Sequence, residues 1–184
     1  MGGAEKKAVW LANKLSKDFC VYFFSLKSSG VLSENLNDEV IIKNFNLVRS
    51  KNIFSKLYYV FVGWFRLVKT IKDEEIHTVI SFLFHSNLYA KIAKIFSFSK
   101  FNHIIAVRSD RLSKRGSNQN ILRMIIFRYF IIDKNSKIIF NSNAGFKRFD
   151  INPKYEQKVI YNSPSNYPDF NIEKIEKFVF VGRL

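Results

Sequence analysis

Apolar residues along the chain alternate between helix-like and strand-like spacing. Near the start, Ala8, Leu11, Ala12 and Leu15 fall on one stripe at helical spacing, and most lysines of that segment lie off it. The segment from Phe19 to Leu26 is a continuous apolar run of strand length, which is typical of a strand covered on both faces. The pattern therefore predicts a helix followed by a buried strand.

A longer helix is predicted where apolar residues recur three and four positions apart, from Ile53 to about Lys72. Its most apolar part, Ile53–Val68, is interrupted by Lys56 and Arg66 and is shorter than the roughly 20 residues that span a bilayer. We therefore expect a buried or interfacial helix there, not a transmembrane one.

The remaining segments continue the alternation. Further strands are expected at 40–42, 78–83, 103–107, 137–140, 158–161 and 177–181, and further helices at 88–96, 121–132 and 144–149. Strands separated by helices in this order predict an α/β fold, a Rossmann-like, doubly wound parallel sheet with helices on both faces. The first strand of such a sheet is usually central, yet no strand precedes the helix that opens at residue 3, so we expect the first strand to be missing.

Size, charge and the content of cysteine and histidine each add to this picture. The chain has 184 residues, enough for one domain with a core, and 47% of them are hydrophobic, which argues against disorder. The net charge of +15 favours an anionic partner: a nucleic acid, a nucleotide diphosphate or an anionic membrane face. The lone Cys20 excludes an intrachain disulfide and suits a reducing compartment, and one Cys with three scattered His predicts no metal site.

Polar residues follow three of the predicted strands. They are His85 and Asn87 after the strand at 78–83, Arg108-Ser109-Asp110 after 103–107, and Asn141 after 137–140. Ligands of parallel α/β proteins bind at the carboxyl ends of the strands, so these side chains are candidates for contacts with a sugar or phosphate. The alternatives are a surface histidine at a helix cap and a local Arg–Asp ion pair of small energetic value.

The two ends of the chain carry residues suited to phosphate. Gly2-Gly3 before a helix leaves backbone N–H groups available to an anion, although a tag-like glycine pair is the alternative. At the other end, the strand Lys177–Val181 is followed by Gly182 and Arg183, and a guanidinium pairs well with a diphosphate.

In order and spacing, these segments resemble the N-terminal half of a family-4 retaining glycosyltransferase of the GT-B fold. Gly2-Gly3-Ala4-Glu5 with the helix behind it, His85-Ser86-Asn87, Arg108-Ser109-Asp110 and Val181-Gly182-Arg183-Leu184 carry the resemblance. It implies an acceptor-binding lobe at 1–161, an interdomain linker at 162–176 and the first strand of a truncated donor-binding lobe at 177–184. The residue roles it implies are His85 as the candidate catalytic group, Gly2, Gly3 and Arg183 at the donor diphosphate, and Glu5, Asn87, Arg108, Ser109, Asp110 and Asn141 on the acceptor side.

The resemblance also implies a reaction: transfer of a sugar from a nucleotide-sugar donor to a glycan or lipid-linked acceptor with retention, without a metal cofactor. The family's usual role is the synthesis of surface polysaccharide or lipopolysaccharide, in the cytoplasm or peripherally on the inner face of the plasma membrane. We expect the chain alone to be inactive, because much of the donor site would lie on another lobe. The alternatives are a basic nucleic-acid-binding module, a non-catalytic subunit that pairs with a separate donor-lobe polypeptide, and a poorly stable fragment.

Overall fold

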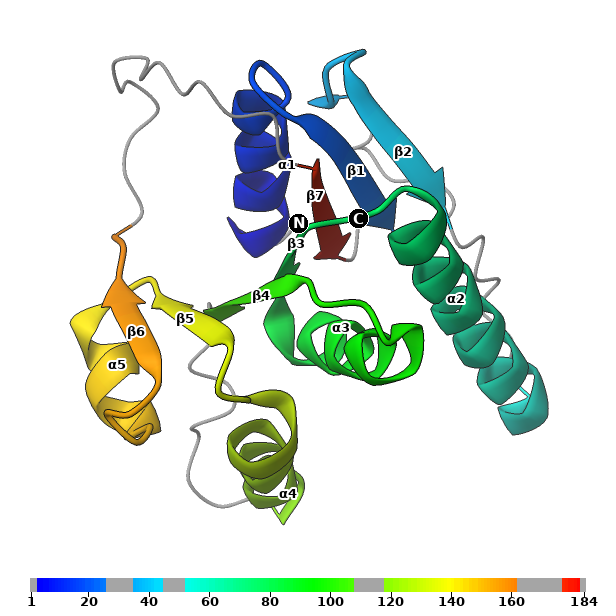
Figure 1. The fold of residues 1–184 in the computed structure, drawn as a ribbon. Coiled ribbons are helices and arrows are strands. Elements are labelled where there is room, and N and C mark those ends of the chain that lie inside the picture. Colours follow the sequence, from blue (N-terminus) through cyan, green and yellow to red (C-terminus); the bar gives the residue numbers. More distant parts are fainter. Residues whose placement is uncertain (1–2, 26–34, 45–51, 108–117, 162–176, 183–184) are drawn as a thin grey trace.

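The structure is a computed structural model that describes residues 3–25, 35–44, 52–107, 118–161 and 177–182 (Figure 1). These residues form one sheet with helices on its two faces. The predicted fold class, a doubly wound parallel α/β sheet, is confirmed.

The sheet has seven strands in the order β2-β1-β7-β3-β4-β5-β6, and every neighbouring pair is parallel. The strands are β1 (Cys20–Ser25), β2 (Val40–Asn44), β3 (Thr78–Phe82), β4 (Asn102–Val107), β5 (Ser136–Phe140), β6 (Glu156–Val159) and β7 (Lys177–Gly182). Most bounds lie within two residues of the predicted ones, because the apolar runs are short and bounded by polar residues.

The helices are α1 (Gly3–Leu15), α2 (Ile53–Asp73), α3 (Leu83–Ser97), α4 (Asn118–Ile126), the π-helical segment η3 (Phe127–Ile131) and α5 (Asn143–Phe149). Helix α1 packs on one face of β1, β7 and β3, whereas α2 and α3 share a core cluster on the other face. The helix expected at 121–132 is therefore two segments, in which the α-helical turns widen to a π-helix from Phe127.

Strand β1 explains why the sequence is apolar at every position from Cys20 to Phe24. Val21 and Phe23 belong to the cluster under α1, whereas Tyr22 and Phe24 belong to the cluster under α2 and α3. Since successive side chains point to opposite faces, a strand covered on both sides needs an apolar residue at each step. Full burial of such a side chain contributes about 1.5–3 kcal/mol.

Strand β7 occupies a position that differs from the prediction. Instead of opening a second unit, residues 177–182 pair with β1 on one side and β3 on the other, at the centre of the sheet. The physical reason is that this apolar run has the length and composition of a fully buried strand, and β7 fills the central position expected to lack a strand. The predicted linker at 162–176 lies outside the described residues.

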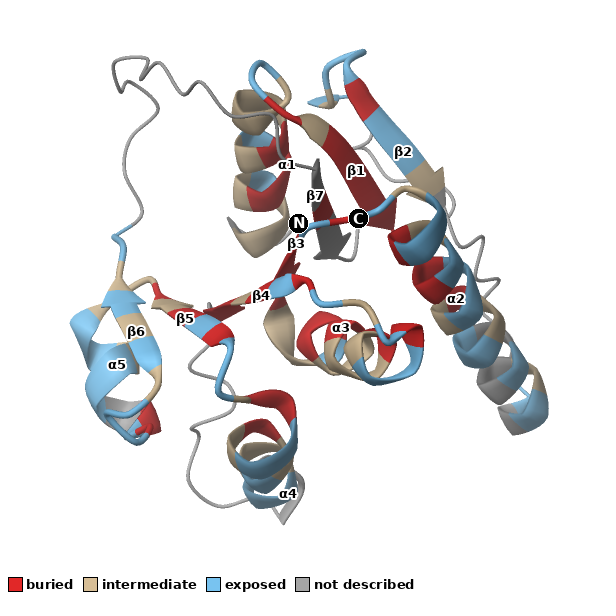
Figure 2. Cartoon of the chain, in the orientation of Figure 1, coloured by how far each residue is buried: buried red, intermediate tan, exposed pale blue. Residues whose placement is uncertain are grey.

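Helix α2 is only partly packed against the rest of the protein. Its buried residues lie toward its end nearest β1, among them Leu67, Val68 and Ile71, and the remainder projects away from the sheet (Figure 2). Of the predicted apolar stripe, Leu67 and Ile71 are buried, Trp64 is half-buried and Val60 is exposed. Among the helices that the structure describes, none has the length and apolar character needed to cross a membrane.

Candidate functional site

The carboxyl edge of the sheet is where the topology concentrates the predicted site residues. Chain order runs outward from β7 in two directions, through β1 and β2 on one side and from β3 to β6 on the other. Such a reversal is the usual place for a ligand in an open parallel sheet, at the carboxyl ends of the strands. Helices α1 and α3 both begin at this edge, because each ends just before the start of a parallel strand.

The described candidates divide between α1, α3 and the end of β5. Gly3 begins α1, and Glu5 lies half-buried in its first turn, where a carboxylate is favourable to the helix dipole. His85 is exposed in the first turn of α3, with its ring 5.7 Å from that of Phe84. Asn141 follows β5 and is half-buried. The topology thus brings these four residues to one edge of the sheet.

Five candidates lie outside the described residues: Gly2, Arg108, Ser109, Asp110 and Arg183. Their predicted contacts with the donor diphosphate and the acceptor stay predictions.

Asn87 is the candidate whose surroundings differ most from an open binding site. It is only 2% exposed, and its Oδ1 accepts a hydrogen bond of 2.7 Å from the Ser81 hydroxyl. A carboxamide held this way ties α3 to β3 and orients the first turns of α3, where His85 lies. Its predicted contact with an acceptor remains untested.

The buried hydrogen bond of Asn87 extends to His103 on β4. The Ser81 Oγ lies 2.8 Å from the His103 Nε2, and the His103 side chain is fully buried. Since the Ser81 proton is donated to Asn87, His103 must donate through Nε2, which leaves its Nδ1 as an acceptor without a partner among the described residues. Burial, reinforced by the charge of Lys94, lowers the pKa of His103 to about 3, so the imidazole is neutral at neutral pH.

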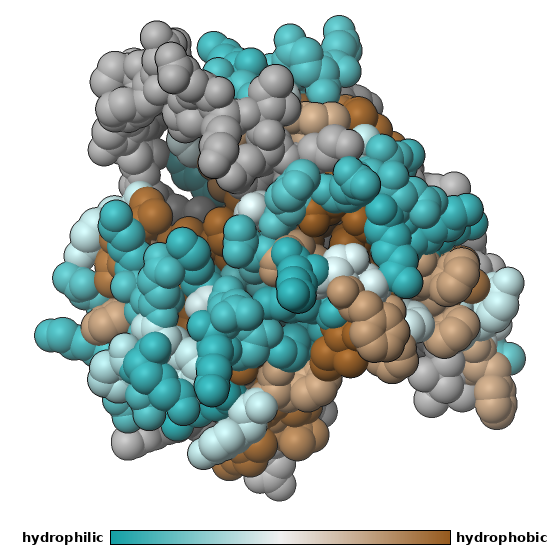
Figure 3. All heavy atoms as spheres, viewed as in Figure 1, coloured by the Kyte–Doolittle hydropathy of each residue, from teal (hydrophilic) through white to brown (hydrophobic). Residues whose placement is uncertain are grey.

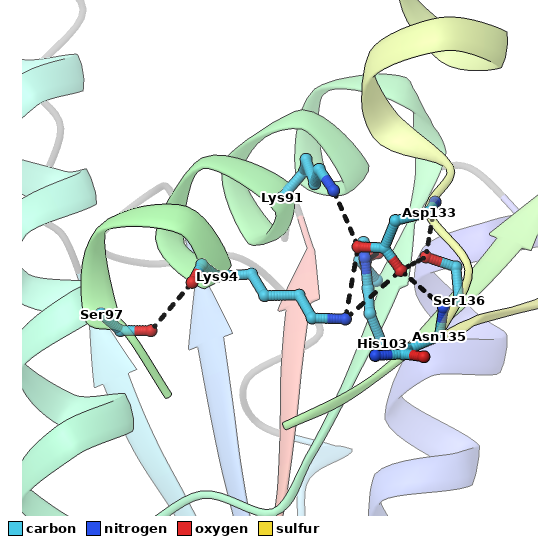
Figure 4. Close-up of polar contacts among 8 residues, drawn as sticks. Lys91, Lys94, Ser97, His103, Asp133, Asn135 and Ser136 are labelled. Atoms are coloured by element: carbon cyan, nitrogen blue, oxygen red, sulfur yellow. Dashed lines mark hydrogen bonds and ion pairs between the residues drawn. The ribbon is translucent and has the colours of Figure 1, made fainter. Parts of the chain in front are cut away.

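A cluster of opposite charges lies beside this buried imidazole (Figure 4). Two lysines of α3 converge on Asp133: Lys91 Nζ lies 2.7 Å and Lys94 Nζ 3.3 Å from its Oδ2. Ser136 donates to the other carboxylate oxygen at 3.0 Å. Burial raises the pKa of Asp133, but the hydrogen bond from Lys91 and the charge of Lys94 outweigh it and lower the pKa to about 2. The cluster fastens α3 to the turn before β5, at the amino edge and away from the candidate site.

An open apolar pocket of about 650 Å³ lies between α2 and α3. The described residues that line it are four of α2 and three of α3: Tyr58, Val60, Phe61, Trp64, Tyr89, Ile92 and Phe96. The Trp64 ring packs edge-on against Phe96 at 4.8 Å and lies 5.6 Å from Phe61. Burial raises the pKa of Tyr89, so its hydroxyl stays protonated at neutral pH.

No family model matches the chain, and no solved structure matches it. The chain is similar to the GalNAc-α-(1→4)-GalNAc-α-(1→3)-diNAcBac-PP-undecaprenol α-1,4-N-acetyl-D-galactosaminyltransferase of Campylobacter jejuni, with 25% identity over an alignment of 189 positions. The similarity supports a glycosyltransferase relationship. It covers 100% of the chain and 50% of the relative, so the chain spans about half the length of this curated relative.

The described residues contain no group of three or more His, Cys, Asp or Glu side chains placed to bind a metal ion. The α2–α3 pocket and the buried Ser81–Asn87–His103 chain were not predicted from the sequence. The sequence did carry a signal for the buried chain, since the polar Ser81 lies within an apolar strand and His103 lies near the start of the next one. The pocket had no such signal, because a stripe of apolar residues on a helix predicts contact with the core.

Proposed function

We propose that the chain is the acceptor-binding lobe of a retaining glycosyltransferase of family 4, with the GT-B fold. It would serve transfer of a sugar from a nucleotide-sugar donor to a lipid-linked glycan in the synthesis of surface polysaccharide or lipopolysaccharide. The observation that carries the proposal is the similarity, along the whole chain, to an enzyme whose name describes transfer to a glycan on PP-undecaprenol. The carboxyl edge, with the helix starts of α1 and α3, is the site that we propose for the acceptor glycan.

The reaction requires little of this lobe beyond binding the acceptor. Negative charge gathers on the leaving diphosphate in the transition state, so the groups that matter most are fixed positive charges and helix N-termini. The start of α1 and the predicted Arg183 are the groups of this chain suited to that role, and we propose no metal cofactor. We therefore expect the chain by itself to bind acceptor without robust transfer.

The exposed aromatic residues of α2 support attachment to the inner face of an anionic membrane. Phe54, Tyr58, Phe61 and Phe65 recur along one exposed face, followed toward the end of the helix by the exposed Lys69. Figure 3 shows hydrophobic side chains at the surface along this helix. Aromatic rings suit the interface of a bilayer, and each lysine near an anionic surface contributes about 1 kcal/mol to binding. A nucleic-acid module does not need such an apolar face.

The acceptor site is tested by binding of glycans to the purified chain. With a panel of hexose and N-acetylhexosamine disaccharides, we expect saturable binding that His85→Ala weakens about three- to tenfold, since it removes one or two hydrogen bonds to sugar hydroxyls. The control is His77→Ala, an exposed histidine just before β3, at the amino edge. Binding of no glycan, or equal loss in both variants, would contradict the proposal, and steeply salt-dependent RNA binding would favour the nucleic-acid alternative.

A further inference from the structure

The α2–α3 pocket has the properties of a ligand site. Its volume of about 650 Å³ lies within the range of about 300–1,000 Å³ common for small-molecule pockets. The described residues of its wall include no charged side chain, and their polar groups are the two tyrosine hydroxyls and the indole N–H of Trp64. Because a wall of this kind offers few hydrogen bonds, it selects an apolar ligand.

The exposed rings around the pocket are more than isolated surface residues. Tyr58, Phe61 and Phe96 all line it while remaining more than half exposed. Contiguous exposed apolar surface of this kind marks an interaction site in a soluble protein.

The pocket is joined to the candidate acceptor site by one face of α3. His85, Tyr89, Ile92 and Phe96 follow one another at spacings of four, three and four residues, which places them on a single helical stripe. At about 1.5 Å per residue, the stripe runs about 16 Å from the candidate sugar contact at His85 to Phe96. A ligand with a glycan at one end and a hydrocarbon chain at the other could therefore follow this helix.

We propose that the α2–α3 pocket holds the isoprenoid chain of the lipid-linked acceptor. The inference rests on the proposed function and assigns the apolar end of the same substrate. Position favours this occupant over an apolar peptide, because the stripe of α3 that lines the pocket begins at His85, the candidate contact for the glycan end of the same substrate.

Farnesyl diphosphate is the probe, and inorganic pyrophosphate is the head-group control. The chain has two tryptophans, so Trp10→Phe leaves Trp64, in the pocket wall, as the sole fluorescence reporter. We expect a saturable change in Trp64 emission with farnesyl diphosphate and none with pyrophosphate. In equilibrium dialysis of the labelled probe, Phe61→Ser should weaken binding about tenfold or more, because it removes a large apolar contact.

A matched variant distinguishes binding in the pocket from nonspecific binding to exposed apolar side chains. Phe65 is 59% exposed and Phe61 is 61% exposed on the same helix, but only Phe61 lines the pocket. Phe65→Ser should bind the probe like the unaltered chain, and Phe96→Ser on α3 should repeat the loss. Probe binding no tighter than pyrophosphate binding, or equal losses in Phe61→Ser and Phe65→Ser, would overturn the assignment.

Failure here is distinguishable from failure of the proposed function. If disaccharides bind in a His85-dependent manner while Phe61→Ser leaves the affinity for farnesyl diphosphate unchanged, the pocket assignment is wrong and the glycan site is supported. If Phe61→Ser and Phe96→Ser weaken farnesyl diphosphate binding and Phe65→Ser does not, while no glycan binds, the pocket is supported as an isoprenoid site and the acceptor role is wrong.

Discussion

At the residue scale, the best-defined polar structure is a set of internal contacts that hold α3. Asn87, Ser81 and His103 form one buried hydrogen-bonded chain, and Asp133 forms ion pairs with two lysines of α3. A buried polar group costs free energy unless it is hydrogen-bonded, so these residues fix one position of α3 against β3, β4 and the start of β5. The exposed His85 depends on that position, because it lies on the same helix.

His103 makes stability depend on pH. Its pKa is about 3 in the folded protein against 6.5 as the ordinary value, so the unfolded chain binds more protons between these values. The stabilisation is therefore fully present above pH 6.5 and is lost as pH falls toward 3, by up to about 1.4 kcal/mol per unit. We expect His103→Gln to flatten this dependence in urea unfolding measured from about pH 7 to about pH 4. Parallel pH profiles in the two proteins would contradict the assignment.

At the element scale, local patterns predicted the strands and helices well. The run from Phe19 to Leu26 became a doubly covered strand because its alternating side chains serve two core clusters. What local patterns could not give was the partner of each strand. Nothing in the sequence of 177–182 distinguishes the first strand of a second lobe from the central strand of this sheet, since both are short, apolar and buried.

The central position of β7 can be tested by a conservative truncation. Val179 is fully buried between the neighbouring strands and the helices above them, so Val179→Ala should lower the free energy of unfolding by about 1–3 kcal/mol. Val159→Ala is the matched control: it shortens a half-buried valine of the edge strand β6 and should cost less than about 1 kcal/mol. Chemical denaturation measures both, and equal small effects would count against a central β7.

At the scale of the whole molecule, the parallel order of the sheet brings the scattered candidates to one edge. The rule that parallel strands end at one edge predicted that His85 and Asn141, which are far apart in the sequence, lie at the same edge. Gly3 and Glu5 join them because α1 begins there. No such rule could predict the α2–α3 pocket, because the pocket depends on where α2 projects away from the sheet. That departure exposes the aromatic face proposed to meet membrane and isoprenoid.

The most direct test of an acceptor site at the carboxyl edge is hydrogen–deuterium exchange of the chain with and without a bound glycan. We expect slower exchange in the first turns of α1 and α3 and just after β5, with little change in the turns that precede β3, β4 and β5. Slower exchange confined to those amino-edge turns, or none anywhere when a glycan is bound, would contradict an acceptor-binding lobe built on this edge.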